Sequence, residues 1–115
     1  MNKTSEIKFV VTLDEKKVPE KIEWEATDSG FKGKKECSSI MVSLWDKEEK
    51  GTLAIDLWTK DMVVDDMNIH FHQVLNKMAD TYERATKNKE VAGMIKNFSS
   101  DFALKTEIIK NVKNR

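Results

Sequence analysis

The stretch LAIDLWTKDMVVDDM, residues 53–67, contains the change of periodicity that decides the fold. Its first half alternates apolar and polar side chains, which is typical of a β-strand with one buried face. From Val64 onward, apolar residues recur at intervals of three and four, which is typical of an amphipathic helix. Asp65 and Asp66 fall in the first turn of that helix, where the helix dipole favours acidic side chains. The stretch therefore predicts a strand that passes through a short loop into a helix.

Period-two segments also occur upstream, at 7–13, 22–26 and 38–45, before the strand at 52–59. The loop between the first two holds the only proline, Pro19, and DSGFKGKK (28–35) is predicted as a flexible loop. DKEEKG is a charged turn between the last two strands. A tight hairpin there pairs Leu44 with Leu53, Val42 with Ile55, and Ile40 with Leu57. All these aliphatic pairs then share one face, which fixes the register.

Two helices are predicted after the strands. The apolar stripe of the first comprises Val64, Met67, Phe71, Val74, Leu75, Met78, Tyr82 and Ala85. Asn88 can cap a second helix that starts at about Lys89. Gly93, Ser99 and Ser100 are expected to weaken this second helix. Its buried stripe is predicted to comprise Val91, Met94, Ile95, Phe98 and Phe102, with a continuation to Ile109.

Strands first and helices last predict a single α+β domain over residues 1–115, with strands at about 6–59 and helices at about 63–110. We expect a four-stranded antiparallel sheet with a C-terminal two-helix hairpin packed on one face. Trp24 follows the parity of that face and is expected in the core. Burial between the layers supplies most of the stability, because helices of this length are marginal alone.

The charge balance and the single cysteine limit the function classes. The 20 basic residues equal the 20 acidic ones, which argues against a broad electrostatic grip on nucleic acid or anionic membrane. No apolar segment approaches the roughly 20 residues needed to span a bilayer, and the N-terminus lacks the apolar stretch of a signal peptide. Cys37 cannot form an intramolecular disulfide. We predict a cytoplasmic protein without membrane insertion or a nucleic-acid partner.

No residue pattern indicates catalysis, a metal or a cofactor. His70 and His72 are the only histidines, and their spacing points them about 200° apart on a helix, so they cannot share a metal ion. Cys37 has no neighbouring histidine to activate it. The glycines match no phosphate-binding spacing. We predict no catalytic residue, no cofactor and no metal, and a small enzyme is the least favoured class.

Met41, Trp45, Asp56 and Trp58 follow the parity opposite to the aliphatic face. Helices on one side of a single-layer sheet cannot bury the other side, so large apolar groups there indicate a partner or a second subunit. We predict that these four residues form a protein interface. The alternative is that loop 28–37 or the C-terminal tail folds over the two tryptophans.

Several uncommon strings resemble the family of the gliding-motility protein GldC. They are TSEIKF, VPEKIEWEATD, IMVSLWD, LAIDLWTKDM and MADTYERAT, and they occur in the same order over roughly one hundred residues. Val63 departs from the proline expected there, which would suit a first helical turn. The resemblance implies a small soluble accessory protein of bacterial gliding motility. It transfers no catalytic residue.

This resemblance favours a non-enzymatic accessory that acts through contacts with a protein of the gliding machinery, and it leaves homo-oligomerisation open. The alternative is a chaperone-like binder of unfolded polypeptide, because strands followed by two helices resemble the export chaperone SecB at fold level. A chaperone should oligomerise and suppress aggregation. An adaptor should bind one motility component.

Overall fold

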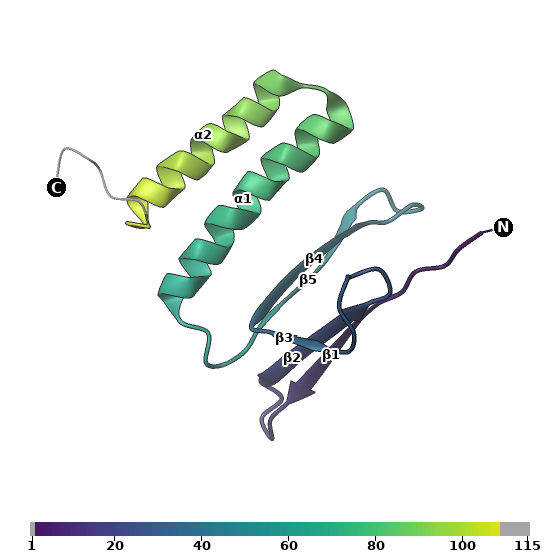
Figure 1. Cartoon of the computed structure of the whole chain (residues 1–115). Coiled ribbons are helices and arrows are strands. Elements are labelled where there is room, and N and C mark those ends of the chain that lie inside the picture. Colours follow the sequence, from purple (N-terminus) through teal and green to yellow (C-terminus); the bar gives the residue numbers. More distant parts are fainter. Residues whose placement is uncertain (1, 109–115) are drawn as a thin grey trace. The chain divides into compact units, whose positions relative to one another are not determined.

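The computed structural model describes residues 2–108, and these form an α+β fold, as predicted (Figure 1). The elements are β1 (Ile7–Leu13), β2 (Pro19–Ala26), β3 (Lys35–Cys37), β4 (Ser39–Trp45), β5 (Thr52–Trp58), α1 (Val64–Thr86) and α2 (Lys89–Lys105). The chain divides into two compact units, Met1–Met62 with the strands and Val63–Arg115 with the helices. The single-domain expectation stays a prediction, as does the packing of the helices on a sheet face.

The first sheet has the order β1-β2-β3, and all its strands are antiparallel. In this sheet Phe9 lies opposite Trp24, and Val11 lies opposite Ile22. The apolar faces predicted for the two strands therefore coincide. Ile22 is fully buried. Strand β2 begins at Pro19, inside the predicted loop, because the first residue of a strand tolerates the missing N–H.

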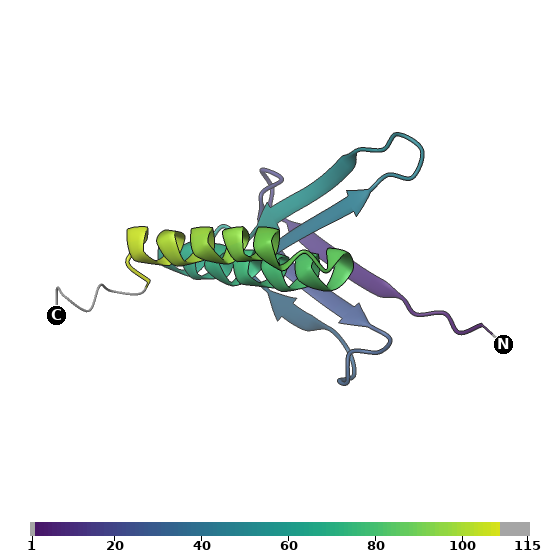
Figure 2. The ribbon, with the colours of Figure 1, turned by 90° about the horizontal axis from the view of Figure 1, so that it is seen from above.

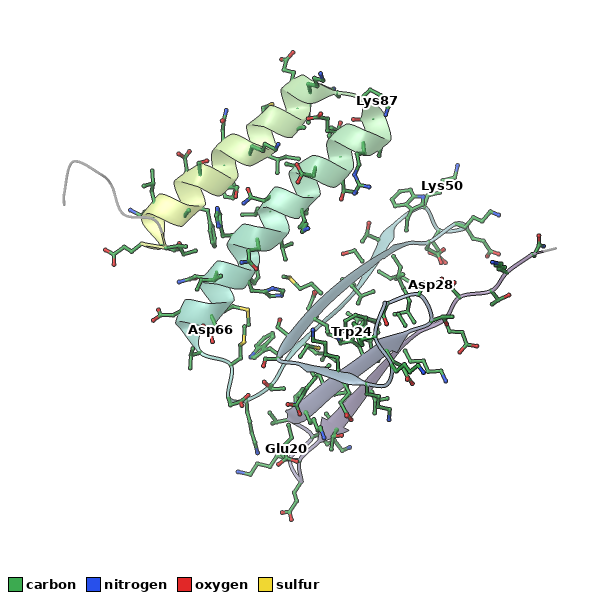
Figure 3. All side chains as sticks on the ribbon, in the orientation of Figure 1. Glu20, Trp24, Asp28, Lys50, Asp66 and Lys87 are labelled. Atoms are coloured by element: carbon green, nitrogen blue, oxygen red, sulfur yellow. The ribbon has the colours of Figure 1, made fainter. Side chains whose placement is uncertain are left out.

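The second sheet is the hairpin β4–β5, and its register is the predicted one. Leu44 lies opposite Leu53, Val42 opposite Ile55, and Ile40 opposite Leu57. The charged turn holds the strand ends together, since the Asp46 N–H donates to the Gly51 carbonyl at 2.8 Å and the Glu49 N–H donates to the Asp46 carboxylate at 2.7 Å. Lys50, at the end of this turn (Figure 3), has a left-handed φ of 54° and donates its N–H to the Asp46 carbonyl at 3.0 Å.

The prediction of one four-stranded sheet is wrong, because the predicted third strand, 38–45, pairs with β5 but not with β2. Strand β2 pairs instead with the short strand β3, Cys37 lying opposite Ile22. The chain then bends at Ser38 and continues as β4, which pairs only with β5. The two sheets diverge from this bend (Figure 2). Part of the loop predicted around residues 28–37 is thereby recruited as β3.

The helical unit is an antiparallel hairpin of α1 and α2 (Figure 1). Lys87, between the helices (Figure 3), adopts a left-handed φ of 63° and donates its N–H to the Glu83 carbonyl at 2.8 Å. The predicted cap is confirmed, because the Asn88 side chain accepts the Val91 N–H at 3.0 Å. Among the described residues, neither helix is apolar enough over a sufficient length to cross a membrane.

The contact with α1 buries small residues of α2 rather than the predicted stripe, and the cover of that stripe by a sheet stays a prediction. Met94 and Phe98 are 64% and 58% exposed. Helix α2 instead buries Ala92, Ser99 and Ala103, and α1 buries Ala79. Small side chains allow the two helix axes to approach closely. The residues at this contact are therefore small rather than strongly hydrophobic. The predicted continuation to Ile109 lies outside the described residues.

Candidate protein interface

The four predicted interface residues share one face of the β4–β5 hairpin. Met41 lies opposite Asp56 in the ladder, and Trp58 lies opposite Ser39. Trp45 is six residues further along β4 from Ser39, and side chains two residues apart point to the same side. At about 3.4 Å per residue, the two tryptophans are about 20 Å apart along the hairpin. The structure thus places them at opposite ends of one elongated surface.

Both tryptophans are open to solvent. Trp45 is 68% and Trp58 is 54% exposed, Asp56 is exposed, and Met41 is half-buried. The remaining residues of this face are small or carry hydroxyl groups: Ser39, Ser43, Thr52 and Ala54. Asp56 is therefore its one charged side chain. Such a surface offers aromatic area, hydroxyl groups and a single acceptor, which suits contact with a protein rather than chemistry.

Loop 28–37, which was expected as one alternative cover for the tryptophans, covers Trp24 instead. Phe31 meets the Trp24 ring edge-on, with ring centroids 5.2 Å apart, and the Lys35 ammonium lies 5.3 Å from the Phe31 centroid. Trp24 on β2 (Figure 3) is consequently half-buried rather than fully in the core. The other alternative, the C-terminal tail, falls on residues outside the described part of the chain.

Within the strand unit, the burial of the aliphatic face of the same hairpin decreases towards the turn. Ile40, next to the bend at Ser38, is buried, whereas Leu44, Leu53 and Ile55 are about half exposed, at 51%, 58% and 49%. Burial in this hairpin is therefore concentrated at the end where the two sheets meet. The end near the turn presents apolar side chains on both faces.

A polar cavity of about 410 Å³ lies where the two sheets meet, and sequence reasoning did not foresee it. Its wall includes Thr59, which is almost fully buried and donates to Asp61 at 2.5 Å. Cys37 also lines it, and burial raises the pKa of this thiol, which disfavours a nucleophilic thiolate. Within residues 2–108 no three metal-ligating side chains cluster. The cavity arises from the bend at Ser38, which no local pattern reveals.

The two histidines lie on α1 and stay apart from any ligand cluster. The His72 Nε2 atom lies 3.5 Å from the Asn76 side-chain amide. The buried Nε2 atom of His70 has no hydrogen-bond partner within the described residues. Neither arrangement resembles a metal site or a catalytic pair.

Comparison with known protein families matches residues 19–108 to the family described as gliding motility-associated protein GldC-like. The match begins with β2 and includes the β4–β5 hairpin and both helices. Neither the curated proteins nor the solved structures contain a match to the chain.

Proposed function

This chain belongs to the gliding motility-associated GldC-like family, and from that premise we propose that it is a small accessory protein of the gliding machinery. It acts in the cytoplasm through contacts with a protein of that machinery and carries out no chemistry of its own. The contact surface is the hairpin face that bears Met41, Trp45, Asp56 and Trp58, which we call the tryptophan face.

The exposure of Trp45 and Trp58 on one face is the observation that carries this proposal. Tryptophan is enriched among residues that dominate binding energy, and truncating one at the centre of an interface typically costs about 2 kcal/mol or more. A surface about 20 Å long suits an extended protein contact better than a small-molecule pocket. The partner should present apolar surface to the rings and a hydrogen-bond donor or a basic group to Asp56.

Crosslinking in gliding cells followed by affinity capture of this protein tests the proposal. The wild type is compared with a Trp45→Ala/Trp58→Ala variant and with a Leu44→Ala/Leu53→Ala variant on the opposite face of the same hairpin. We expect the tryptophan variant to lose a defined motility component and to impair gliding, and the leucine variant to retain both. Equal capture by all three proteins would overturn the assignment of this surface.

Binding of unfolded polypeptide is the second candidate function, and the exposed apolar side chains favour it. Leu53 and Ile55 on the aliphatic face and Met94 and Phe98 on α2 are each about half exposed or more. Such groups bind unfolded chains with little sequence preference. Suppression of the aggregation of an unrelated denatured protein at equimolar amounts would favour this candidate, and its absence would leave the adaptor.

A further inference from the structure

The two ends of the tryptophan face differ in charge. Trp58 lies two residues after Asp56 on β5, so the two side chains point to the same side and their Cα atoms are about 7 Å apart. Trp45 lies opposite Thr52 and two residues after Ser43, and neither of these carries a charge. Both rings are more than half exposed, yet only Trp58 has a carboxylate beside it on this face. The two ends therefore offer different chemistry to a partner.

The Asp56 carboxylate has no cation beside it in the strand unit. Aspartate is depleted from strands, because its short side chain favours turns and helix caps. Asp56 is exposed, and no ion pair among the described residues uses it. Lys60, the nearest basic residue along the chain, pairs with Asp14 and Glu20 instead. Residues that go against the preference of their own element are expected at functional sites.

Met41 completes the surroundings of this carboxylate. The Thr59 N–H donates to the Ser38 carbonyl, so the hydrogen-bonded pairs of this ladder alternate with pairs such as Met41 and Asp56. The Cα atoms of such a non-hydrogen-bonded pair are about 4.5 Å apart, and their side chains lie close together. We call Met41, Asp56 and Trp58 the cation end of the tryptophan face. It offers an adaptable apolar side chain, a negative charge and an aromatic ring next to one another.

We propose that the cation end binds an arginine side chain of the protein partner, an inference that rests on the proposed function and names the chemistry of its contact. The guanidinium pairs with the Asp56 carboxylate and lies on the Trp58 ring, while the methylene groups of the arginine pack on Met41. Arginine can make both polar contacts at once, because its planar group donates through its edge and stacks through its face. A lysine ammonium is a compact, strongly hydrated charge without such a face.

The difference between the ends also sets the direction in which the partner binds. The other end, Trp45 with Ser43 and Thr52, takes an apolar side chain of the partner about 20 Å from the arginine. A partner turned end for end would place its guanidinium beside Trp45 without a carboxylate on that face, and would leave Asp56 covered by an apolar group. Burying an unpaired charge is costly, so the reversed complex is disfavoured.

Small probes test the cation end without knowledge of the partner. Nα-acetyl-arginine amide is compared with the citrulline analogue, which has nearly the same shape without the charge, and with the lysine analogue, which has the charge without the planar group. Each probe is titrated into the isotope-labelled full chain at constant ionic strength, and the three indole N–H signals are followed by NMR. Trp45→Phe and Trp58→Phe variants assign the signals. Trp24, which packs against Phe31, is the reference.

We expect the arginine probe to shift the Trp58 signal more than the Trp45 signal and to bind about tenfold more tightly than the citrulline probe. The lysine probe should bind more weakly than the arginine probe. Asp56→Asn should remove the preference for arginine over citrulline. Glu48→Gln, which removes an exposed carboxylate from the turn next to Trp45, should retain it. Equal binding of arginine and citrulline, equal binding of arginine and lysine, or equal shifts of the two signals would overturn the proposal.

Crosslinking and capture in gliding cells separates a failure of this inference from a failure of the proposed function. We expect Asp56→Asn to capture less of the motility component than wild type, and Glu48→Gln to capture as much. If Asp56→Asn captures as much as wild type while Trp45→Ala/Trp58→Ala loses the component, the arginine contact is wrong and the tryptophan face stands. If the double variant also retains the component, both are wrong. Circular dichroism confirms that each variant is folded.

Discussion

The Lys60 Nζ atom lies 3.0 Å from the Asp14 Oδ2 atom, so an ion pair joins the turn after β1 to the segment after β5. The same carboxylate accepts the N–H groups of Lys16 at 2.8 Å and Val18 at 3.0 Å through its Oδ1 atom. Asp14 thus organises the β1–β2 turn and ties it to the end of the second sheet. Both groups belong to the strand unit.

This arrangement predicts a pH dependence of stability. The Val18 N–H first, and Lys60 next, hold the pKa of Asp14 below its ordinary value of 3.8. A carboxyl group whose pKa is lower in the folded state than in the unfolded state stabilises the folded state at pH values above its unfolded-state pKa. This stabilisation is lost as the pH falls through its folded-state pKa. In urea unfolding, Asp14→Asn should be less stable than wild type at pH 7, and the difference should shrink below about pH 3.8. A difference that stays constant down to pH 2 would contradict this account.

The contact between the helices predicts a sharp difference between adjacent serines. Ser99 is fully buried and donates to the Asn76 side-chain oxygen at 2.7 Å, whereas Ser100 is exposed. Ser99→Ala should reduce the free energy of unfolding by about 1 kcal/mol, since one hydrogen bond is lost. Ser99→Leu should cost about 1–3 kcal/mol, because it overpacks the close contact. Denaturant unfolding measures both, and Ser100→Ala, the control, should change stability by less than about 0.5 kcal/mol.

Ile22 should be the most costly position of the first sheet. It is fully buried, so Ile22→Ala leaves a cavity and should reduce the free energy of unfolding by about 2–5 kcal/mol. Val10→Ala on the neighbouring strand removes a side chain that is 40% exposed and should cost less than about 1 kcal/mol. Similar costs for the two variants in urea unfolding would show that Ile22 does not anchor this sheet.

The tryptophan face should contribute little to folding. Because Trp45 and Trp58 are more than half exposed, Trp45→Ala/Trp58→Ala should lower the free energy of unfolding of the isolated monomer by less than about 2 kcal/mol. Thermal unfolding at a concentration below any self-association measures this. A much larger loss would assign the rings to the core and remove the basis for a contact surface.

The local features of the fold could be predicted because neighbouring residues determine them. The alternation over 52–59 and the charged turn before it define the β4–β5 register, since a slip of one residue would invert every side chain. The N-cap of α2 follows from a side chain within one turn, that of Asn88. The predicted interface residues share a face for the same local reason, because alternate residues of two paired strands point to the same side. Their role as an interface stays a proposal.

Contacts between distant segments could not be predicted in the same way. Phe31 had no periodic signal, yet it packs on Trp24. Helix propensity predicts that Ser99 weakens α2, yet Ser99 is buried because its small side chain fits the contact with α1. The periodic pattern of the sequence shows which side chains are hydrophobic, whereas a close contact between helices depends on side-chain volume.

By itself, the sequence determined the α+β class, the strand pairing around the charged turn, the two helices and the face that carries Trp45 and Trp58. These features depend on the side-chain repeats of 2.0 residues in a strand and 3.6 residues in a helix, which any short stretch of sequence displays. Only the tertiary structure decided that β3 pairs with β2 while β4, after the bend at Ser38, pairs with β5, which divides the sheet in two. An antiparallel strand can pair on either side at similar energy per residue, so packing among distant residues decides where it changes partner.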